Sequence, residues 1–102
     1  MADFKTIYMN ISVNATEFVT LPCSTSVGLF VVSWQYRQSE SANLQHVHLG
    51  LTADGAGTLK RVNDDYSLTI ETAKVNDSGW YYCIDKTRGQ PLYIIWLTIR
   101  IG

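Results

Sequence analysis

Two cysteines and the aromatic residues placed near them constrain the fold of this chain more than any other feature. Trp34 follows the first cysteine, Cys23, and Tyr81 stands two residues before the second, Cys83. The second cysteine ends the run Asp77-Ser78-Gly79-Trp80-Tyr81-Tyr82-Cys83, in which an acidic residue and a small turn pair precede an aromatic strand. Because each member of this group has its own structural task, the combination is specific. A chance arrangement in an unrelated β-protein is the weaker alternative.

The length and charge of the chain limit its domain count and its partners. At 102 residues it fits one domain, with 46% hydrophobic and 17% charged residues, which is ordinary for a globular protein. The formal net charge of -1 provides no basic field for phosphates or anionic lipid headgroups. We therefore expect no nucleic-acid partner, and we expect any partner to be met through shape and apolar contact.

Alternating apolar and polar residues predict β-strands throughout the chain and no helix. In residues 18–23, for example, Val19, Leu21 and Cys23 share one face, because strand side chains repeat every two residues. Small and polar residues between these segments predict loops and turns. The expected strands are residues 5–13, 18–23, 29–37, 44–51, 58–62, 66–71, 79–85 and 92–101.

This strand order and eight residues at matching places resemble the immunoglobulin V-set along almost the whole chain: Cys23, Trp34, Arg61, Leu68, Asp77, Gly79, Tyr81 and Cys83. The resemblance implies an all-β V-type sandwich of two antiparallel sheets, formed as a single domain by residues 5–102. It also implies an inter-sheet disulfide between Cys23 and Cys83, with Trp34 packed against it and a tyrosine corner at Tyr81.

The resemblance further implies a structural ion pair at the base of the sandwich. In the V-set, an Arg that opens strand D pairs with the Asp that precedes the Tyr-x-Cys run. The matching positions here are Arg61 and Asp77, and Lys60 is the competing cation. As a pair near the surface it should contribute only about 0–1 kcal/mol unless it is partly buried.

Two departures from the V-set pattern bear on the kind of receptor. Antigen-receptor V domains usually carry Phe-Gly-x-Gly at the start of the last strand, whereas residues 92–97 contain no glycine. This favours a germline-encoded receptor of the co-receptor, costimulatory or innate immune type. In addition, Trp34 is followed by Gln35-Tyr36-Arg37-Gln38 and not directly by Tyr-Arg-Gln. The shift moves the tyrosine ring to inward parity and disfavours antibody-like pairing through this strand.

Disulfide use and glycosylation signals indicate an extracellular location. A persistent disulfide requires an oxidising compartment, and sequons for N-glycosylation begin at Asn10, Asn14 and Asn76. We expect a glycan at Asn14 before Asn76, because Asn14 lies in a predicted turn whereas Asn76 adjoins Asp77. We therefore expect the cell-surface ectodomain of a single-pass membrane protein, with residues 1–4 as a leader scar and any membrane segment outside this chain.

The period-two pattern divides the last strands into an inner and an outer side. Counting from Cys83 places three residues of one strand outside: Trp80, Tyr82 and Ile84. The family pattern places three residues of the last strand inside: Leu97, Ile99 and Ile101. Because strands G, F, C and C′ are neighbours in a V-set sheet, we expect one partner-binding patch on its outer face: Gln35, Arg37, Tyr82, Ile84, Ile94 and Trp96. The alternative is that the domain's own C′ strand or loops cover Trp96 and Tyr82.

The predicted hairpin tip at residues 86–91 is a second candidate for partner binding. Loops on a rigid sandwich commonly carry recognition, and Lys86 and Arg88 give this tip a small positive charge, with residues 24–30 beside it. A merely solvated loop is an equal alternative.

The sequence does not support an enzyme or a cofactor site. Both cysteines are used in the expected bridge, no Ser/His/Asp arrangement stands out, and no glycine-rich phosphate loop follows a strand. His46 and His48 share a strand face, but no third metal ligand has suitable spacing, so an ordinary polar strand face is the preferred interpretation. We expect no metal, cofactor or small-molecule substrate.

These expectations together predict non-enzymatic protein–protein recognition by the ectodomain of an immune cell-surface receptor. Binding is expected through the outer face of strands G, F, C and C′ and through the apical loops, with a CD8-like homodimer as one form of assembly. A homophilic cell-adhesion domain is the alternative. An antigen-receptor variable chain is disfavoured by the missing glycines.

Overall fold

The computed structural model of the protein describes residues 5–24, 31–50 and 58–101. The expected leader scar at residues 1–4, most of the loop at 24–30 and the turn at 52–57 lie outside the described residues. The described part consists of strands and turns together with one short 3-10 turn, η1 (Val75–Asp77), which the sequence pattern did not predict. No helix in this part is long and apolar enough to cross a membrane.

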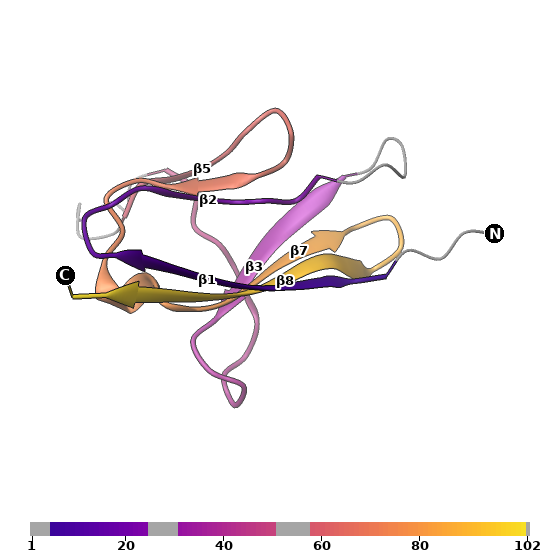
Figure 1. Ribbon diagram of the computed structural model, residues 1–102. Helices are drawn as coiled ribbons and strands as arrows, with labels where there is room; N and C mark the ends of the chain where they lie inside the picture. Colours follow the sequence, from indigo (N-terminus) through magenta and orange to yellow (C-terminus); the bar gives the residue numbers. More distant parts are fainter. Residues whose placement is uncertain (1–4, 25–30, 51–57, 102) are drawn as a thin grey trace.

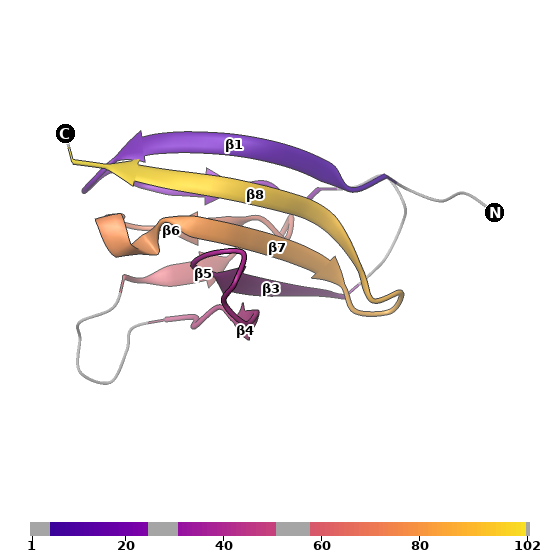
Figure 2. The same ribbon diagram turned by 90° about the horizontal axis from the view of Figure 1, so that it is seen from below.

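The described residues form eight strands: β1 (Ile7–Asn14), β2 (Val19–Leu21), β3 (Val32–Arg37), β4 (Gln45–His46), β5 (Lys60–Val62), β6 (Leu68–Ile70), β7 (Gly79–Asp85) and β8 (Gln90–Arg100). They make a five-stranded sheet of order β1-β8-β7-β3-β4 and a three-stranded sheet of order β2-β6-β5. The two sheets pack face to face (Figure 1), and the large sheet is seen broadside in Figure 2. This arrangement confirms the all-β V-type sandwich that the resemblance implied.

The first strand, β1, lies against the last strand, β8, over its whole length. The two run parallel, from Ile7 beside Tyr93 to Asn14 beside Arg100, whereas the other strand pairs of the described residues are antiparallel. The start of β1 and the end of β8 therefore lie at opposite ends of the sandwich (Figure 1). The sequence predicted an edge strand here but not its partner. Because of this pairing, the outer side of β1 extends the face of the large sheet beyond β8.

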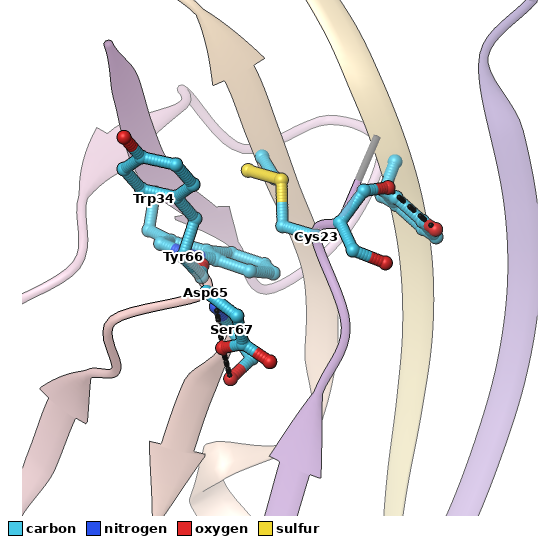
Figure 3. The surroundings of a disulfide bond; sticks show 8 residues. Cys23, Trp34, Asp65, Tyr66 and Ser67 are labelled. Carbon is cyan, nitrogen blue, oxygen red and sulfur yellow. Dashed lines mark hydrogen bonds between the residues drawn. A yellow bond between two sulfur atoms is a disulfide. The ribbon is translucent and has the colours of Figure 1, made fainter. Parts of the chain in front are cut away.

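The disulfide and the core lie between the two sheets. Cys23 and Cys83 are bonded and fully buried, and Trp34 belongs to the same core cluster, as the resemblance implied. The indole Nε1 of Trp34 donates a hydrogen bond of 2.7 Å to the carbonyl oxygen of Tyr66, and both residues lie beside the disulfide in Figure 3. Tyr66 has a positive φ of 70°, which interrupts an extended backbone. For this reason β6 begins at Leu68 and not at Tyr66 as predicted.

The residues before Cys83 form the expected tyrosine corner. The hydroxyl of Tyr81 donates a hydrogen bond of 2.6 Å to the carbonyl oxygen of Asp77. The ring of Tyr36 packs inward with its centroid 4.8 Å from that of Tyr81, as the parity of its strand predicted. Gly79 lies against this ring. A Cβ at Gly79 would be 2.7 Å from a ring carbon of Tyr36, and its φ of 149° also disfavours other residues, so this turn requires glycine.

The ion pair at Asp77 is made by Lys60, so the predicted pairing with Arg61 is wrong. The Nζ of Lys60 lies 2.9 Å from the Oδ1 of Asp77, and the two side chains are only 14% and 8% exposed. Successive strand residues point to opposite faces, so Arg61 is directed away from this site. It pairs instead with Glu71 at 3.2 Å, with 58% of its own side chain exposed.

Three donors hold the carboxylate of Asp77 in its ionised form. Burial opposes ionisation, but hydrogen bonds from the backbone N–H of Lys74, from Lys60 and from the hydroxyl of Thr58 hold the pKa of Asp77 below its usual range. The bonds from Lys74 and Thr58 reach Oδ2 at 2.8 and 2.7 Å. This cluster connects β5 and the segment before it to η1, at the base of the sandwich.

The inner side of β8 fills the core as far as Ile99. Leu97 and Ile99 are buried, as the family pattern implied, and so is Ile95. Ile101 is 86% exposed, so its predicted inward position is wrong. The strand β8 ends at Arg100, which is also where its partner β1 ends, and the next residue has no sheet to pack against.

A β-bulge lies at the start of β8, although this stretch has no glycine. The register shifts between Cys83, which pairs with Tyr93, and Ile84, which pairs with Pro91, so Leu92 is the extra residue. Both Leu92 and Tyr93 are buried, whereas neighbours in a regular strand would alternate. Bulges do not all require a positive φ, and Leu92 has none. The absence of glycine from residues 92–97 therefore does not remove the bulge.

The edge strand opposite β1 is shorter than predicted. A strand was expected over residues 44–51, but β4 contains only Gln45 and His46, which pair with β3. Beyond it, an isolated bridge joins Gly50 to Lys60. The five-stranded sheet is therefore bounded by one long edge, β1, and one short edge, β4.

Candidate functional site

The outer face of the five-stranded sheet carries the residues expected to bind a partner. Along β7, Gly79, Tyr81, Cys83 and Asp85 are buried, and the residues between them are half-buried. The half-buried residues point away from the core, as the counted parity predicted: Trp80, Tyr82 and Ile84. The strand registers arrange these residues and their neighbours in two rows that cross the sheet.

The first row is dominated by two tryptophans. Trp96 of β8 pairs with Trp80 of β7, and their ring centroids are 4.8 Å apart with an interplanar angle of 48°. Asn10 of β1 lies next to Trp96 on one side, and Arg37 of β3 lies next to Trp80 on the other. Both indoles are half-buried, and the exposed part of each gives this row an apolar surface that faces outward.

The second row lies two residues further along the strands and mixes apolar and polar groups. Tyr82 stands between Ile94 and Gln35, and Tyr8 of β1 extends the row with 71% exposure. The guanidinium of Arg37, from the first row, lies over the ring of Tyr82 with its Cζ 5.4 Å from the centroid. This cation–π contact connects the two rows.

The structure brings together all six residues that were predicted for this patch: Gln35, Arg37, Tyr82, Ile84, Ile94 and Trp96. The alternative was that the C′ strand or loops cover Trp96 and Tyr82. In the described part of the chain, β4 lies beside β3 at the far edge, and both aromatic residues are half-buried and not covered completely. The geometry therefore favours an open face, and partner binding by these residues stays a prediction.

Three members of this face were not predicted as part of the patch: Tyr8, Asn10 and Trp80. Parity placed Trp80 outside, but its contact with Trp96 depends on the register between β7 and β8. Tyr8 and Asn10 alternate with Met9 and Ile11, which pack against the core, and this alternation was a usable signal. What no local pattern shows is that β1 pairs with β8.

The tip of the β7–β8 hairpin is less positive than its sequence suggested. The guanidinium of Arg88 lies 2.6 Å from the carboxylate of Asp85, which is buried. This hydrogen bond holds the pKa of Asp85 below its usual range, so the charge of Arg88 is balanced within the hairpin. Gly89 closes the turn by donating its N–H to the carbonyl oxygen of Asp85 at 2.7 Å. Lys86 is exposed, and its role in binding stays a prediction.

A hollow of about 270 Å³ near β4 is lined by both histidines and reaches Asp77. His46 lies with its Nδ1 3.2 Å from the hydroxyl of Ser33. Within the described ranges, no group of three or more His, Cys, Asp or Glu residues is placed to hold a metal ion. Asp77 already accepts hydrogen bonds from three donors, so the hollow offers no free carboxylate at this point.

The asparagines of the three sequons are exposed. Asn10 and Asn14 point outward from β1, and Asn76 belongs to η1. Asn14 is the last residue of β1, so it ends a strand and does not lie within the predicted turn. Its backbone N–H donates a hydrogen bond of 2.7 Å to the side-chain carboxylate of Glu17. The expected order of glycosylation, Asn14 before Asn76, stays a prediction.

Several solved structures have a fold similar to that of this chain. The extracellular fragment of Novel Immune-Type Receptor 11 from Ictalurus punctatus has a TM-score of 0.65 and 22% identity, over 93% of this chain and 99% of that chain. Drosophila Semaphorin 2a has a TM-score of 0.71 and 18% identity, over 95% of this chain and only 15% of that chain. The extracellular domain of the voltage-gated sodium channel beta4 subunit has a TM-score of 0.62 and 16% identity, over 100% of this chain and 92% of that chain. No curated protein matches the sequence.

These identities are low, so the solved structures show a shared fold and nothing more specific. A separate comparison of the sequence with protein families matches the immunoglobulin domain over residues 10–91. This range includes both bonded cysteines, Trp34 and the tyrosine corner. The chain therefore belongs to the immunoglobulin domain family, with a V-set-like sandwich as its fold.

Proposed function

We propose that this domain is the recognition ectodomain of an immune cell-surface receptor and binds a protein partner through the outer face of its five-stranded sheet. The observation that carries the proposal is the continuous aromatic surface of Trp80, Trp96 and Tyr82, which Arg37 joins through its contact with Tyr82. Interface centres are enriched in Trp, Tyr and Arg. A sheet face that only meets water would instead alternate to polar side chains at these positions.

The extracellular, receptor-type setting is supported by chemistry that is separate from the face. The Cys23–Cys83 disulfide requires an oxidising compartment, and the sequons at Asn10, Asn14 and Asn76 suit a secretory route. The similarity to an immune-type receptor fragment extends over nearly the full length of both chains. Immunoglobulin domains of this kind act by binding, so we propose no enzymatic activity.

Alanine substitutions at the centre of the face test the proposal. Fluorescent tetramers of the secreted domain are used to stain leukocytes, and Trp96→Ala and Tyr82→Ala should each abolish the staining. Thr98→Ala is a matched control, because Thr98 lies on the same side of β8 but pairs with Ser12 outside the aromatic rows. Circular dichroism should show all variants folded. Staining that survives in both aromatic variants contradicts the proposal.

Homophilic pairing, either between cells or as a receptor homodimer, is the second candidate function. The observation that favours it is the start of β1, where Tyr8 is 71% exposed at the end of the second row, beside Ile94. The sodium channel beta4 structure is described as a parallel homodimer that explains a role in cell-cell adhesion. Sedimentation of the domain at increasing concentration separates the two candidates. A dimer that Trp96→Ala disrupts favours pairing, and a monomer that still stains cells favours a different partner.

A further inference from the structure

The first sequon places a glycosylation site directly beside the tryptophan pair. In Asn10-Ile11-Ser12, Asn10 and Ser12 are exposed on the outer side of β1, whereas Ile11 packs against the core. The register sets Asn10 opposite Trp96, and Trp96 opposite Trp80. Asparagine and both indoles therefore lie on one line across three neighbouring strands, on the same face.

The spacing of this line suits the first sugars of an N-linked glycan. Neighbouring strands are roughly 4.8 Å apart, so the Cα atoms of Trp96 and Trp80 lie roughly 5 Å and 10 Å from that of Asn10. The first two N-acetylglucosamine units of a glycan bent across the sheet are long enough to cover both distances. The start of the glycan thus has the two indoles within reach.

The chemistry of the two surfaces also matches. The tryptophans are tilted at 48° with centroids 4.8 Å apart, and each is half-buried, so their exposed parts form a shallow apolar surface without a covering element in the described part of the chain. An exposed apolar patch on a secreted domain normally has a partner that covers it. The C–H faces of N-acetylglucosamine pack well on an indole, and its polar edges stay in water.

We propose that a glycan on Asn10 packs its first sugars over Trp96 and Trp80 and shields the first row of the sheet face. Tyr82 and Ile94, in the second row, remain open. If the face binds a partner as proposed above, the glycan also controls that binding. The domain without a glycan on Asn10 then binds the partner more tightly than the domain that carries one. This last consequence rests on the proposed function, whereas the shielding itself does not.

The same strand provides a matched control. Asn14 also begins a sequon and also points outward from β1, but its register partner is Arg100 and not a tryptophan. It lies four residues beyond Asn10, which is about 13 Å along a strand. The first sugars on Asn14 therefore have no indole beneath them, although they share the strand and the face.

Quenching of tryptophan fluorescence by acrylamide tests the shielding without any partner. The full chain is secreted from animal cells as wild type and as Asn10→Gln, Ser12→Ala and Asn14→Gln, and glycopeptide masses give the occupancy of each site. Asn10→Gln and Ser12→Ala both remove the first sequon and should raise the quenching constant by the same amount. Asn14→Gln should leave it unchanged. Trp34 is only 5% exposed, so acrylamide quenches its fluorescence little in any of these proteins.

Three results overturn the inference: an unoccupied Asn10, an unchanged quenching constant when the glycan at Asn10 is lost, or an equal rise in Asn14→Gln. Control by the glycan is measured separately, as tetramer staining and sedimentation of Asn10→Gln against wild type. A failure of the proposed function would abolish the effect of Tyr82→Ala on binding but leave the quenching result intact. The two ideas therefore fail in different experiments.

Discussion

The two sides of β7 perform different tasks with residues that are adjacent in the sequence. On the inner side, Tyr81 and Cys83 are 1% and 0% exposed, and each is bonded to a residue outside the strand. On the outer side, Trp80 and Tyr82 are half-buried and contact neighbours on the same face. The inner residues of β7 are therefore required for folding, whereas the outer ones are available to contact a partner. Substitutions on the two sides should separate stability from binding.

The largest loss of stability is expected when the disulfide is removed. The bond joins residues separated by 60 positions, and releasing a loop of that size lowers the free energy of unfolding by about 4 kcal/mol. The double variant Cys23→Ala, Cys83→Ala should show this loss in urea unfolding at 25 °C. Trp96→Ala, on the outer side, should lose much less. Comparable losses in the two proteins would contradict the division between the sides.

Removing the carboxylate of Asp77 should cause the next largest loss. In Asp77→Ala, the ammonium of Lys60 and the hydroxyl of Thr58 lose their acceptor in a site where the Lys60 side chain is only 14% exposed. Losses of about 2–4 kcal/mol are typical when one partner of such a cluster is removed. Urea unfolding measures the change. Asp77→Asn keeps the size of the side chain and part of its hydrogen bonding, so its loss should be smaller.

Acid should remove part of the stability that the carboxylate of Asp77 provides. The folded-state pKa of Asp77 is lower than its ordinary value of 3.8, so its ionised form stabilises the fold above about pH 4. This stabilisation is lost as the pH falls through the folded-state pKa. The pKa values of Asp65 and Asp85 are also lowered, so acid weakens their contributions as well. The test is therefore the difference in the free energy of unfolding between wild type and Asp77→Asn, measured from pH 6 to pH 2. That difference should shrink on acidification, and a constant difference would contradict the assignment.

Tyr81 and Tyr82 allow a sharper comparison of the two sides of β7, because Tyr→Phe removes only a hydroxyl at each position. Tyr81→Phe leaves the buried carbonyl of Asp77 without its donor and should cost about 1–2 kcal/mol in unfolding. Burial and the nearby charge of Asp77 raise the pKa of Tyr81, so its hydroxyl remains a donor at neutral pH. Tyr82→Phe should change stability by less than about 0.5 kcal/mol, since this hydroxyl belongs to an outward-facing ring. Equal losses would place both rings in the interior.

The features that the sequence predicted correctly are those that depend on local alternation. The inward side of β7, the outward position of Trp80 and the inward ring of Tyr36 follow from counting residues by twos, whereas the inward side of β8 was implied by the family pattern. The partners of Cys23 and Tyr81 were implied by the family resemblance. Local alternation and residues that match a family pattern can both be found in one sequence, so these features could be placed without knowing which strands pair.

The features that the sequence did not predict depend on which segments become neighbours in space. The parallel pairing of β1 with β8, and hence the position of Asn10 beside Trp96, is a contact between the two ends of the chain. Whether Lys60 or Arg61 pairs with Asp77 depends on which of these adjacent residues faces the core. The strand β5 has only three residues, so counting by twos does not decide between them. Ile101 continued the alternation of β8 in the sequence, but the sheet ends before it.

The smallest effect is expected for Arg61, which was predicted as the partner of Asp77. Its side chain is 58% exposed and its pair with Glu71 is on the surface, so Arg61→Ala should change the free energy of unfolding by less than about 0.5 kcal/mol. Lys60→Ala, the matched change at the preceding residue, leaves the buried carboxylate of Asp77 without its cation and should cost about 1–3 kcal/mol. Urea unfolding of the two variants ranks them directly. If Arg61→Ala were the more damaging change, Arg61 and not Lys60 would supply the cation for Asp77 in solution. The inner and outer sides of β5 would then be exchanged, because one residue of shift reverses every side chain of a strand.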